Sequence, residues 1–256
     1  MDSYSREIEV AKEIALSAGK IILKYFDGDQ GLELKEDDSP VTKADVLVNE
    51  LVISELEESF PEDGIIGEEK STADYGMGRK WFCDPIDGTV GFVWGTPTAM
   101  FSLSLVVDGK PVLGVVYDAF LNRMYEGVVG GGSFCNGERL KVSEGGLEKG
   151  HVAVTADVKK IRSFDYIARL QDEGAYVPVF SGAVYKSCLV ARGKFEGYVE
   201  PGVGAHDMAA VQVIVEEAGG KITSSEGNNL DYSKPFKGAI VSNKKVHDKV
   251  VEIVNQ

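Results

Sequence analysis

The residues best suited to chemistry lie in the stretch 81–89, which reads Trp-Phe-Cys-Asp-Pro-Ile-Asp-Gly-Thr. Its apolar start predicts a strand that delivers Asp84, and we expect Pro85 to fix the next backbone angle and stop that strand. Asp87 follows one bend later, so the two carboxylates can converge on one point, with the carbonyl oxygen of Ile86 between them. Hard divalent cations such as Mg²⁺ prefer oxygen ligands of this kind. The spacing therefore predicts a cation site.

The end of the same stretch suits an anion. Gly88 and Thr89 can present free backbone N–H groups at the start of the following segment, and such groups bind phosphate oxygens. An ordinary Asp-Pro and Asp-Gly turn is the alternative, and it would be preferred for the short pieces taken alone.

Three further acidic features share this layout. Glu68 and Glu69 come directly after an apolar pair, Asp207 is placed as the N-cap of a helix, and Asp45 falls in the first turn of a helix capped by Thr42. Each has a simpler explanation when taken singly: a solvated loop, helix capping, or an acid that is favourable to the helix dipole. Their coincidence in one chain favours a shared site.

In this order and spacing, the four acidic strings resemble the inositol monophosphatase family. The strings are 40–45 (PVTKAD), 67–69 (GEE), 84–89 (DPIDGT) and 206–210 (HDMAA). This family belongs to the Mg²⁺-dependent, lithium-sensitive sugar phosphatases, with fructose-1,6-bisphosphatases as relatives. The resemblance extends over nearly the whole chain. It implies a layered αβαβα sandwich of mixed α+β and α/β class, with an antiparallel N-terminal sheet and a mixed C-terminal sheet.

The resemblance also implies a set of metal ligands. One Mg²⁺ would be held by Glu68, Asp84 and the carbonyl oxygen of Ile86. A second would be held by Asp84, Asp87 and Asp207, with Asp84 bridging the two ions. Glu68 would also help a weaker third ion through waters, so two or three Mg²⁺ ions per site are expected.

Catalytic and phosphate-binding roles carry over in the same way. Asp45 and Thr89 would position and activate the attacking water, together with Glu68, while Gly88 and Thr89 would bind the phosphate. The family's ligand matches Glu68 rather than Glu69. An alternative function outside enzyme catalysis is a noncatalytic cation-binding protein on the same fold. Such a protein would need neither Asp45 nor Thr89. A P-loop phosphotransferase is excluded because no glycine-rich stretch ends in Gly-Lys-Ser/Thr.

The substrate side rests on fewer residues. Glu200 stands seven residues before Asp207, where the family has a glutamate that contacts sugar hydroxyls. Gly182 and Ala183 match a turn that approaches the ring, and Asp87 is included among the substrate contacts. Inositol 1-phosphate is the first candidate substrate. Fructose 1,6-bisphosphate, histidinol phosphate and 3′-phosphoadenosine 5′-phosphate are the alternatives.

Several residues depart from the family pattern on this side. His206 replaces a frequent tryptophan, Val90 begins a pair that is commonly polar, and Val211 replaces a frequent glycine. These departures leave hydrolysis intact but leave the identity of the ester open. Lys186 reads as a solvated helix lysine, with contact to a second phosphate as the alternative. The segment 71–78 is a hypothetical lid.

The elements that must position these residues follow from periodicity. Apolar residues at helical spacing predict helices over 5–26 and from Thr42 to about 60, and alternating β formers predict an antiparallel hairpin around 108–111. After about residue 150, strands alternate with helices. The expected strands there are 151–155, 176–180, 195–200, 221–223 and 238–241, and the expected helices are 160–173, 183–191, 207–218 and 244–254. We place the boundary between an N-terminal part, 1–146, and a C-terminal part, 147–256.

Composition limits the remaining possibilities. The 256 residues carry 41 acidic and 27 basic side chains, a net charge of −14, which disfavours nonspecific binding to nucleic acid or to anionic membranes. No apolar run approaches the length of a spanning helix, and no signal peptide is visible. Three dispersed cysteines argue against a disulfide framework and favour a reduced, cytoplasmic location. The family resemblance also implies that the protein forms a homodimer.

Overall fold

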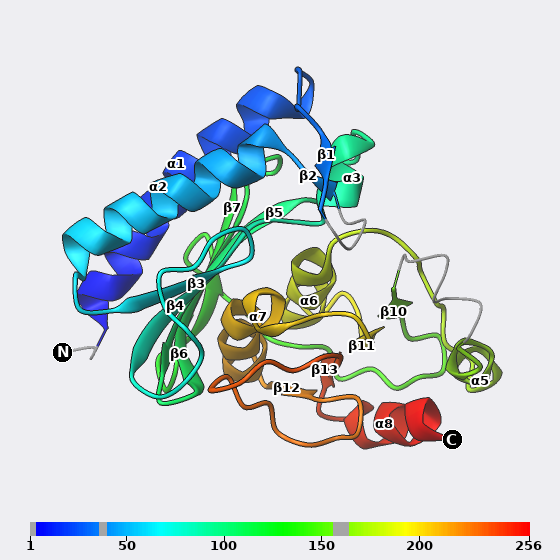
Figure 1. Ribbon diagram of the computed structural model, residues 1–256. Helices are drawn as coiled ribbons and strands as arrows, with labels where there is room; N and C mark the ends of the chain where they lie inside the picture. The colour runs from blue at the N-terminus through cyan, green and yellow to red at the C-terminus, as the bar shows by residue number, and fades with distance from the viewer. Residues whose placement is uncertain (1–3, 36–39, 156–163) are drawn as a thin grey trace.

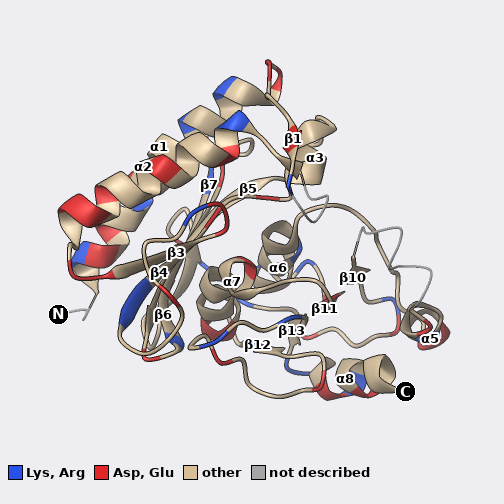
Figure 2. Ribbon diagram, viewed as in Figure 1, with Lys and Arg blue, Asp and Glu red and all other residues tan. Residues whose placement is uncertain are grey.

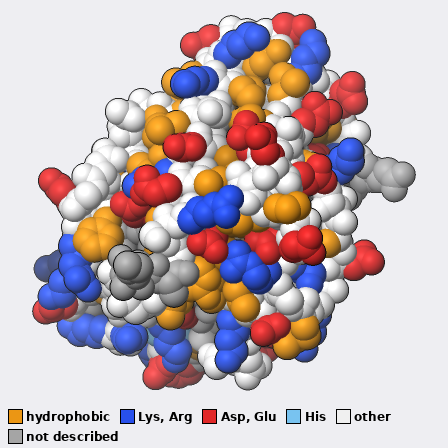
Figure 3. Space-filling model, turned by 90° about the vertical axis from the view of Figure 1, so that its left-hand side faces the viewer, with side chains coloured by type: hydrophobic (Ala, Val, Ile, Leu, Met, Phe, Trp, Pro, Cys, Tyr) orange, Lys and Arg blue, Asp and Glu red, His pale blue; other side chains and the backbone are white. Residues whose placement is uncertain are grey.

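The computed structural model describes residues 4–35, 40–155 and 164–256. Five layers succeed one another in Figure 1: two long helices, a seven-stranded sheet, two helices, a four-stranded sheet and two short helices. The expected αβαβα sandwich is therefore confirmed. Acidic and basic residues both occur along the outer helices in Figure 2, and acidic and basic side chains intermingle on the face shown in Figure 3.

The first layer consists of α1 (Ser5–Phe26) and α2 (Lys43–Ser59), which pack against each other and against the larger sheet. Both helices bury one apolar face, as the spacing predicted. Helix α2 begins at a capping box in which Thr42 and Asp45 each accept a hydrogen bond from the other's backbone N–H. A two-stranded ribbon, β1 (Glu33–Leu34) with β2 (Pro40–Val41), precedes it.

The larger sheet has the order β3-β4-β5-β6-β7-β8-β9. Its strands are β3 (Gly64–Gly67), β4 (Arg79–Asp87), β5 (Met100–Val107), β6 (Lys110–Asp118), β7 (Arg123–Val128), β8 (Gly132–Cys135) and β9 (Glu138–Arg139). The pair β3–β4 is parallel and the other pairs are antiparallel. A turn at residues 136–137 separates β8 from β9.

Pro85 does not stop β4, contrary to the sequence prediction. The strand runs on to Asp87, with a register irregularity between Asp84 and Asp87. Proline is tolerated at such a bulge because the ladder does not use its missing N–H there. The bulge bends the strand end and places both carboxylates on the same side of the turn.

The smaller sheet is mixed and has the order β10-β11-β13-β12. Its strands are β10 (Val152–Val154), β11 (Gly197–Glu200), β13 (Ala239–Asn243) and β12 (Gly220–Thr223). Strands β10 and β11 are parallel, and the other two pairs are antiparallel. Helices α6 (Ala183–Ala191) and α7 (Ala205–Glu217) lie between the sheets, whereas α5 (Tyr166–Asp172) and α8 (His247–Asn255) cover the outside.

Two expectations for this half need correction. The strand expected over 176–180 is reduced to isolated bridges at Tyr176 and Val179, and Pro178, which has no N–H to donate, lies between them. Of the helix expected over 160–173, residues 160–163 lie outside the described residues, and the described helix is α5. One buried cluster joins Phe82 and Met100 of the larger sheet to Met208 of α7, so the core continues across residue 146.

None of the described helices is both long and apolar enough to cross a membrane.

Candidate active site

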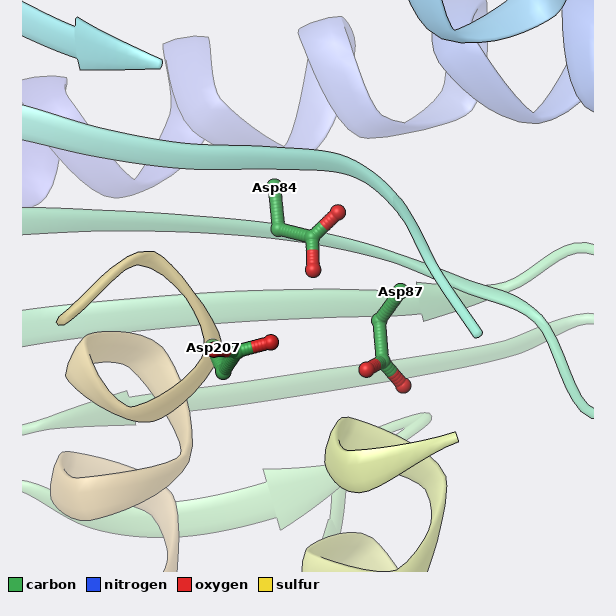
Figure 4. Close-up of side chains that lie close together, drawn as sticks. All are labelled: Asp84, Asp87 and Asp207. Atoms are coloured by element: carbon green, nitrogen blue, oxygen red, sulfur yellow. The ribbon is translucent and has the colours of Figure 1, made fainter. Parts of the chain in front are cut away.

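Three carboxylates from distant parts of the chain converge between the sheet and the helices. Each of Asp84, Asp87 and Asp207 offers an oxygen, and these three atoms lie within 4.8 Å of one another. Figure 4 shows the three side chains pointing toward a common space, from the end of β4 and from the start of α7. Oxygen donors at this separation can hold a divalent cation.

Asp84 is the central member of this group. Its carboxylate accepts a hydrogen bond from the N–H of Ile86 at 3.0 Å, and only 2% of the residue is exposed. Burial raises the pKa of Asp84 well above the usual range, and the charges of Glu68, Asp87 and Asp207 raise it further. The carboxylates therefore repel one another unless a cation or protons offset their charge.

Asp87 is held by the first turn of α6. Its two carboxylate oxygens accept hydrogen bonds from the N–H groups of Ala183 and Val184, both at 2.9 Å. Burial, followed by the charge of Asp207, raises the pKa of Asp87 to about 7. The turn before α6 lies so close that a Cβ atom on Gly88 would come within 3.0 Å of the Cα of Gly182.

Asp207 is not the N-cap of its helix, as the sequence had suggested. Helix α7 begins at Ala205 after the N-cap Gly204, and Asp207 is its third residue. Because glycine offers no capping side chain, the carboxylate of Asp207 reaches back and accepts the N–H of Gly204 at 2.6 Å. Burial is the largest cause of its raised pKa.

Asp45 and Thr89 lie together beside this group. The Thr89 hydroxyl is 3.5 Å from Asp45 Oδ1 and 3.0 Å from the carbonyl oxygen of Ile86. The other oxygen of Asp45 accepts hydrogen bonds from the N–H and the hydroxyl of Thr42, at 2.8 and 2.6 Å. Burial raises the pKa of Asp45 to about 6. Gly88 adopts a left-handed conformation with φ of 84° and caps the short helix α3 (Thr89–Val93).

Glu68 and Glu69 follow β3, and both pair with a lysine that sequence analysis did not single out. The ammonium group of Lys35 lies 2.9 Å from Glu68 and 2.6 Å from Glu69. Glu68 and Lys35 line the same cavity as Asp207, although Glu68 is not among the residues whose oxygens lie within 4.8 Å of one another.

A cavity of about 680 Å³ opens beside Asp207. Lys35, Glu68, Glu200 and His206 are among the residues that line it. Glu200 ends β11 and is 8% exposed, so it forms part of the cavity wall while being mostly buried. Gly182 and Ala183 lie beside Asp87, and the N–H of Ala183 donates a hydrogen bond to its carboxylate.

Lys186 contradicts its sequence interpretation. It was expected to be solvated, but it is 2% exposed, with its ammonium group 3.9 Å from Glu200 Oε2. A helix pattern shows which face is polar, but it cannot show that a partner strand brings an acid to that face.

Known proteins resemble this chain over most of its length. Residues 3–256 match the model of the inositol monophosphatase family. The chain is 36% identical to a histidinol-phosphatase of Chlorobaculum parvum over 219 residues, which cover 84% of each protein. It is 35% identical to human inositol monophosphatase 2, covering 87% of this chain and 82% of the relative. An inositol monophosphatase structure from Thermotoga maritima superimposes with a TM-score of 0.89 at 29% identity, covering 98% of this chain and 97% of the other. The chain therefore belongs to the inositol monophosphatase family, and it is a phosphatase of that family.

Proposed function

We propose that this phosphatase is a Mg²⁺-dependent phosphoric monoester hydrolase that releases phosphate from a small polyol phosphate, with inositol 1-phosphate as the first candidate. The observation that carries the proposal is the convergence of Asp84, Asp87 and Asp207 beside the Asp45–Thr89 pair. A cation-binding protein would need the three aspartates only, so the presence of the Asp45–Thr89 pair favours catalysis over a noncatalytic role.

The donor set fits Mg²⁺. The groups that face the common space include three carboxylates, which are hard ligands. Burial and mutual repulsion raise the pKa values of Asp84 and Asp87, so a compensating positive charge would stabilise their ionised forms. Glu68, Asp84 and the carbonyl oxygen of Ile86 would hold one ion, and Asp84, Asp87 and Asp207 a second. A third, weaker ion would use Glu68. Bound Mg²⁺ would supply the positive charge that lets a phosphate dianion accept attack by water and release an alkoxide.

Asp45 and Thr89 would orient that water, and the Asp45 carboxylate would accept its proton. The Thr89 hydroxyl lies 3.0 Å from the Ile86 carbonyl oxygen and 3.5 Å from Asp45 Oδ1, so it can donate its proton to either oxygen. Asp45 in turn is fixed by Thr42 at the start of α2. In-line attack requires the water and the leaving oxygen on opposite sides of phosphorus. The N–H groups of Gly88 and Thr89 would hold the phosphate between them.

The leaving group would occupy the cavity beside Asp207, with Glu200 accepting hydrogen bonds from its hydroxyls and the Gly182–Ala183 turn approaching it. The relatives carry the names inositol monophosphatase, histidinol-phosphatase and fructose-1,6-bisphosphatase/inositol-1-monophosphatase, which keeps these esters as candidates. A 3′-phosphoadenosine 5′-phosphate phosphatase is a further alternative.

We also propose a cytoplasmic homodimer whose protomer has an N-terminal part, 1–146, with most metal ligands and a C-terminal part, 147–256, with Asp207 and the substrate contacts. All three cysteines are free, which suits a reducing compartment.

A panel of phosphate esters tests the function. We expect Mg²⁺-dependent phosphate release, highest with one polyol monoester and inhibited by millimolar lithium. The panel should include inositol 1-phosphate, histidinol phosphate, fructose 1,6-bisphosphate and 3′-phosphoadenosine 5′-phosphate. No release from any ester at saturating Mg²⁺ would instead favour the noncatalytic cation-binding role.

A further inference from the structure

Lys186 is a buried cation that the proposed reaction does not use. It lies in the middle of α6, between the two sheets, and is only 2% exposed. Placing an ammonium group in the interior is costly unless it is paired and hydrogen-bonded, and burial lowers the pKa of Lys186 accordingly. Its partners therefore indicate what it stabilises.

The ammonium group has four described partners. It donates hydrogen bonds to the carbonyl oxygens of Phe180 at 3.1 Å and Val154 at 3.2 Å. It lies 3.9 Å from Glu200 Oε2 and 4.4 Å from the centre of the Tyr198 ring. A lysine has three N–H donors and no acceptor. Because two of these donors are bonded to carbonyl oxygens and the side chain is buried, Lys186 is not available to bind a second phosphate of the substrate.

Two of these partners belong to the side of the site that receives the leaving group. Phe180 opens the turn that runs through Gly182 into α6, and Glu200 ends β11 in the wall of the cavity that Asp207 also lines. One ammonium group therefore joins the turn to the carboxylate.

The charge of Lys186 also acts on Glu200. Burial raises the pKa of Glu200, and the Lys186 charge is the largest influence that opposes this rise. The Tyr198 hydroxyl donates to Glu200 Oε2 at 3.1 Å, and the Gly202 N–H donates to Oε1 at 3.3 Å. These contacts fix the direction of the Glu200 carboxylate, and the Lys186 charge favours its ionised form.

We propose that Lys186 is a positioning residue that holds Glu200 as a fixed hydrogen-bond acceptor for hydroxyl groups of the leaving group. The inference rests on the proposed function, since it assumes that the cavity receives the leaving group. Its consequence is selectivity: the Lys186–Glu200 pair favours esters whose leaving group carries hydroxyls over esters that offer none.

The test compares two esters with the full chain at saturating Mg²⁺. Inositol 1-phosphate offers hydroxyls, whereas p-nitrophenyl phosphate offers none. The kcat/KM for inositol 1-phosphate divided by the kcat/KM for p-nitrophenyl phosphate therefore reports the contact of Glu200 with those hydroxyls. Lys186→Met should lower this ratio about tenfold or more, mainly through a higher KM for the polyol ester. Glu200→Gln should lower it similarly, and the double variant should be no lower than Glu200→Gln alone. Lys194→Met, an exposed lysine just after α6, is the matched control and should leave the ratio unchanged.

Three outcomes would overturn the role of Lys186. One is an equal loss for both esters with Lys186→Met, which indicates a merely structural role. Another is kcat/KM values that stay at the wild-type level for both esters. The third is a double variant about tenfold below Glu200→Gln, and this comparison stays valid if Lys186→Met alone fails to fold. A wild-type protein that hydrolyses neither ester would instead refute the proposed function, whereas hydrolysis with a ratio insensitive to Lys186 would refute only this inference.

Discussion

Asp84→Asn should make the metal-free protein more stable while it removes activity. The amide keeps the size of the side chain and the acceptor for the Ile86 N–H, so the packing at the β4 bulge is preserved. It removes one of the mutually repelling charges. Stability and turnover should therefore change in opposite directions, which is unusual for a substitution at a fully buried residue.

The magnitude follows from the neighbouring carboxylate. Its environment raises the pKa of Asp87 from 3.8 to about 7, which corresponds to a cost of about 4 kcal/mol for ionising it in the folded protein above that pH. Asp84 is at least as buried and faces the charges of Glu68, Asp87 and Asp207. Water that enters the metal-free site offsets part of the cost of burial and repulsion, so we expect a gain on the order of 3 kcal/mol at pH 8. For a chain of this size, that gain raises Tm by roughly 6–12 °C.

The pH dependence has a definite sign. A carboxyl whose pKa is higher in the folded state than in the unfolded state binds a proton preferentially in the folded state. The stability contributed by Asp84 and Asp87 therefore increases as pH falls from 8 toward 6. The gain from Asp84→Asn should shrink over the same range, because protonation relieves the repulsion in the wild type as well.

Thermal unfolding in EDTA and in saturating Mg²⁺, together with phosphate release, checks this reasoning. Mg²⁺ at about a hundred times its Kd should stabilise the wild type by about 2.7 kcal/mol and the variant much less. Turnover of the variant should fall by about a hundredfold or more. Asp248→Asn is the control, since its side chain is 92% exposed and its Tm should hardly change. A variant less stable than the wild type in EDTA at pH 8, or one with near-normal Mg²⁺-dependent turnover, would refute the argument.

Three other perturbations have defined outcomes. Burial lowers the pKa of His247 to about 4. At saturating Mg²⁺ the unfolding free energy should therefore fall by about 2 kcal/mol from pH 7 to pH 5, because the unfolded histidine takes up a proton. Urea unfolding of the wild type and of His247→Gln measures this fall, and an equal dependence of the unfolding free energy on pH in both proteins would contradict the prediction. Lys35→Met removes the ion pair with Glu68. In activity titrations it should lower the half-saturating Mg²⁺ concentration about two- to fivefold. An increase would show that Lys35 assists metal binding. Thr89→Val should reduce kcat about a hundredfold, and Thr89→Ser should restore most of the rate. The Mg²⁺ affinity measured by calorimetry should change little, and a parallel loss of affinity would mean that Thr89 supports metal binding instead.

The sequence predicted most accurately the features that local spacing determines. The helix that begins after Thr42, and the pair Asp84 and Asp87 on one strand end, both follow from short-range rules. The convergence of Asp207 with that pair does not, because more than a hundred residues separate them; the family resemblance supplied it. The continuation of β4 through Pro85 was missed because a bulge depends on the neighbouring strand.

The burial of Lys186 and the pairing of Lys35 were missed for a related reason. Both form ion pairs with residues on other elements, Glu200 at the end of β11 and Glu68 after β3, and periodicity within a segment carries no information about the partner element. The isolated bridges at Tyr176 show the opposite error: a β-rich segment does not become a full strand when a proline interrupts its ladder.

The backbone holds the acidic site in place at the starts of three helices. Asp45, Asp87 and Asp207 accept N–H groups at the starts of α2, α6 and α7, respectively. These N–H groups have no partner within their own helices, so the carboxylates satisfy donors that would otherwise need capping. The same contacts fix the directions of the carboxylates. Capping offsets only part of the cost of their charge, because burial and mutual repulsion still raise their pKa values. A bound cation would offset the remainder while leaving these backbone contacts in place.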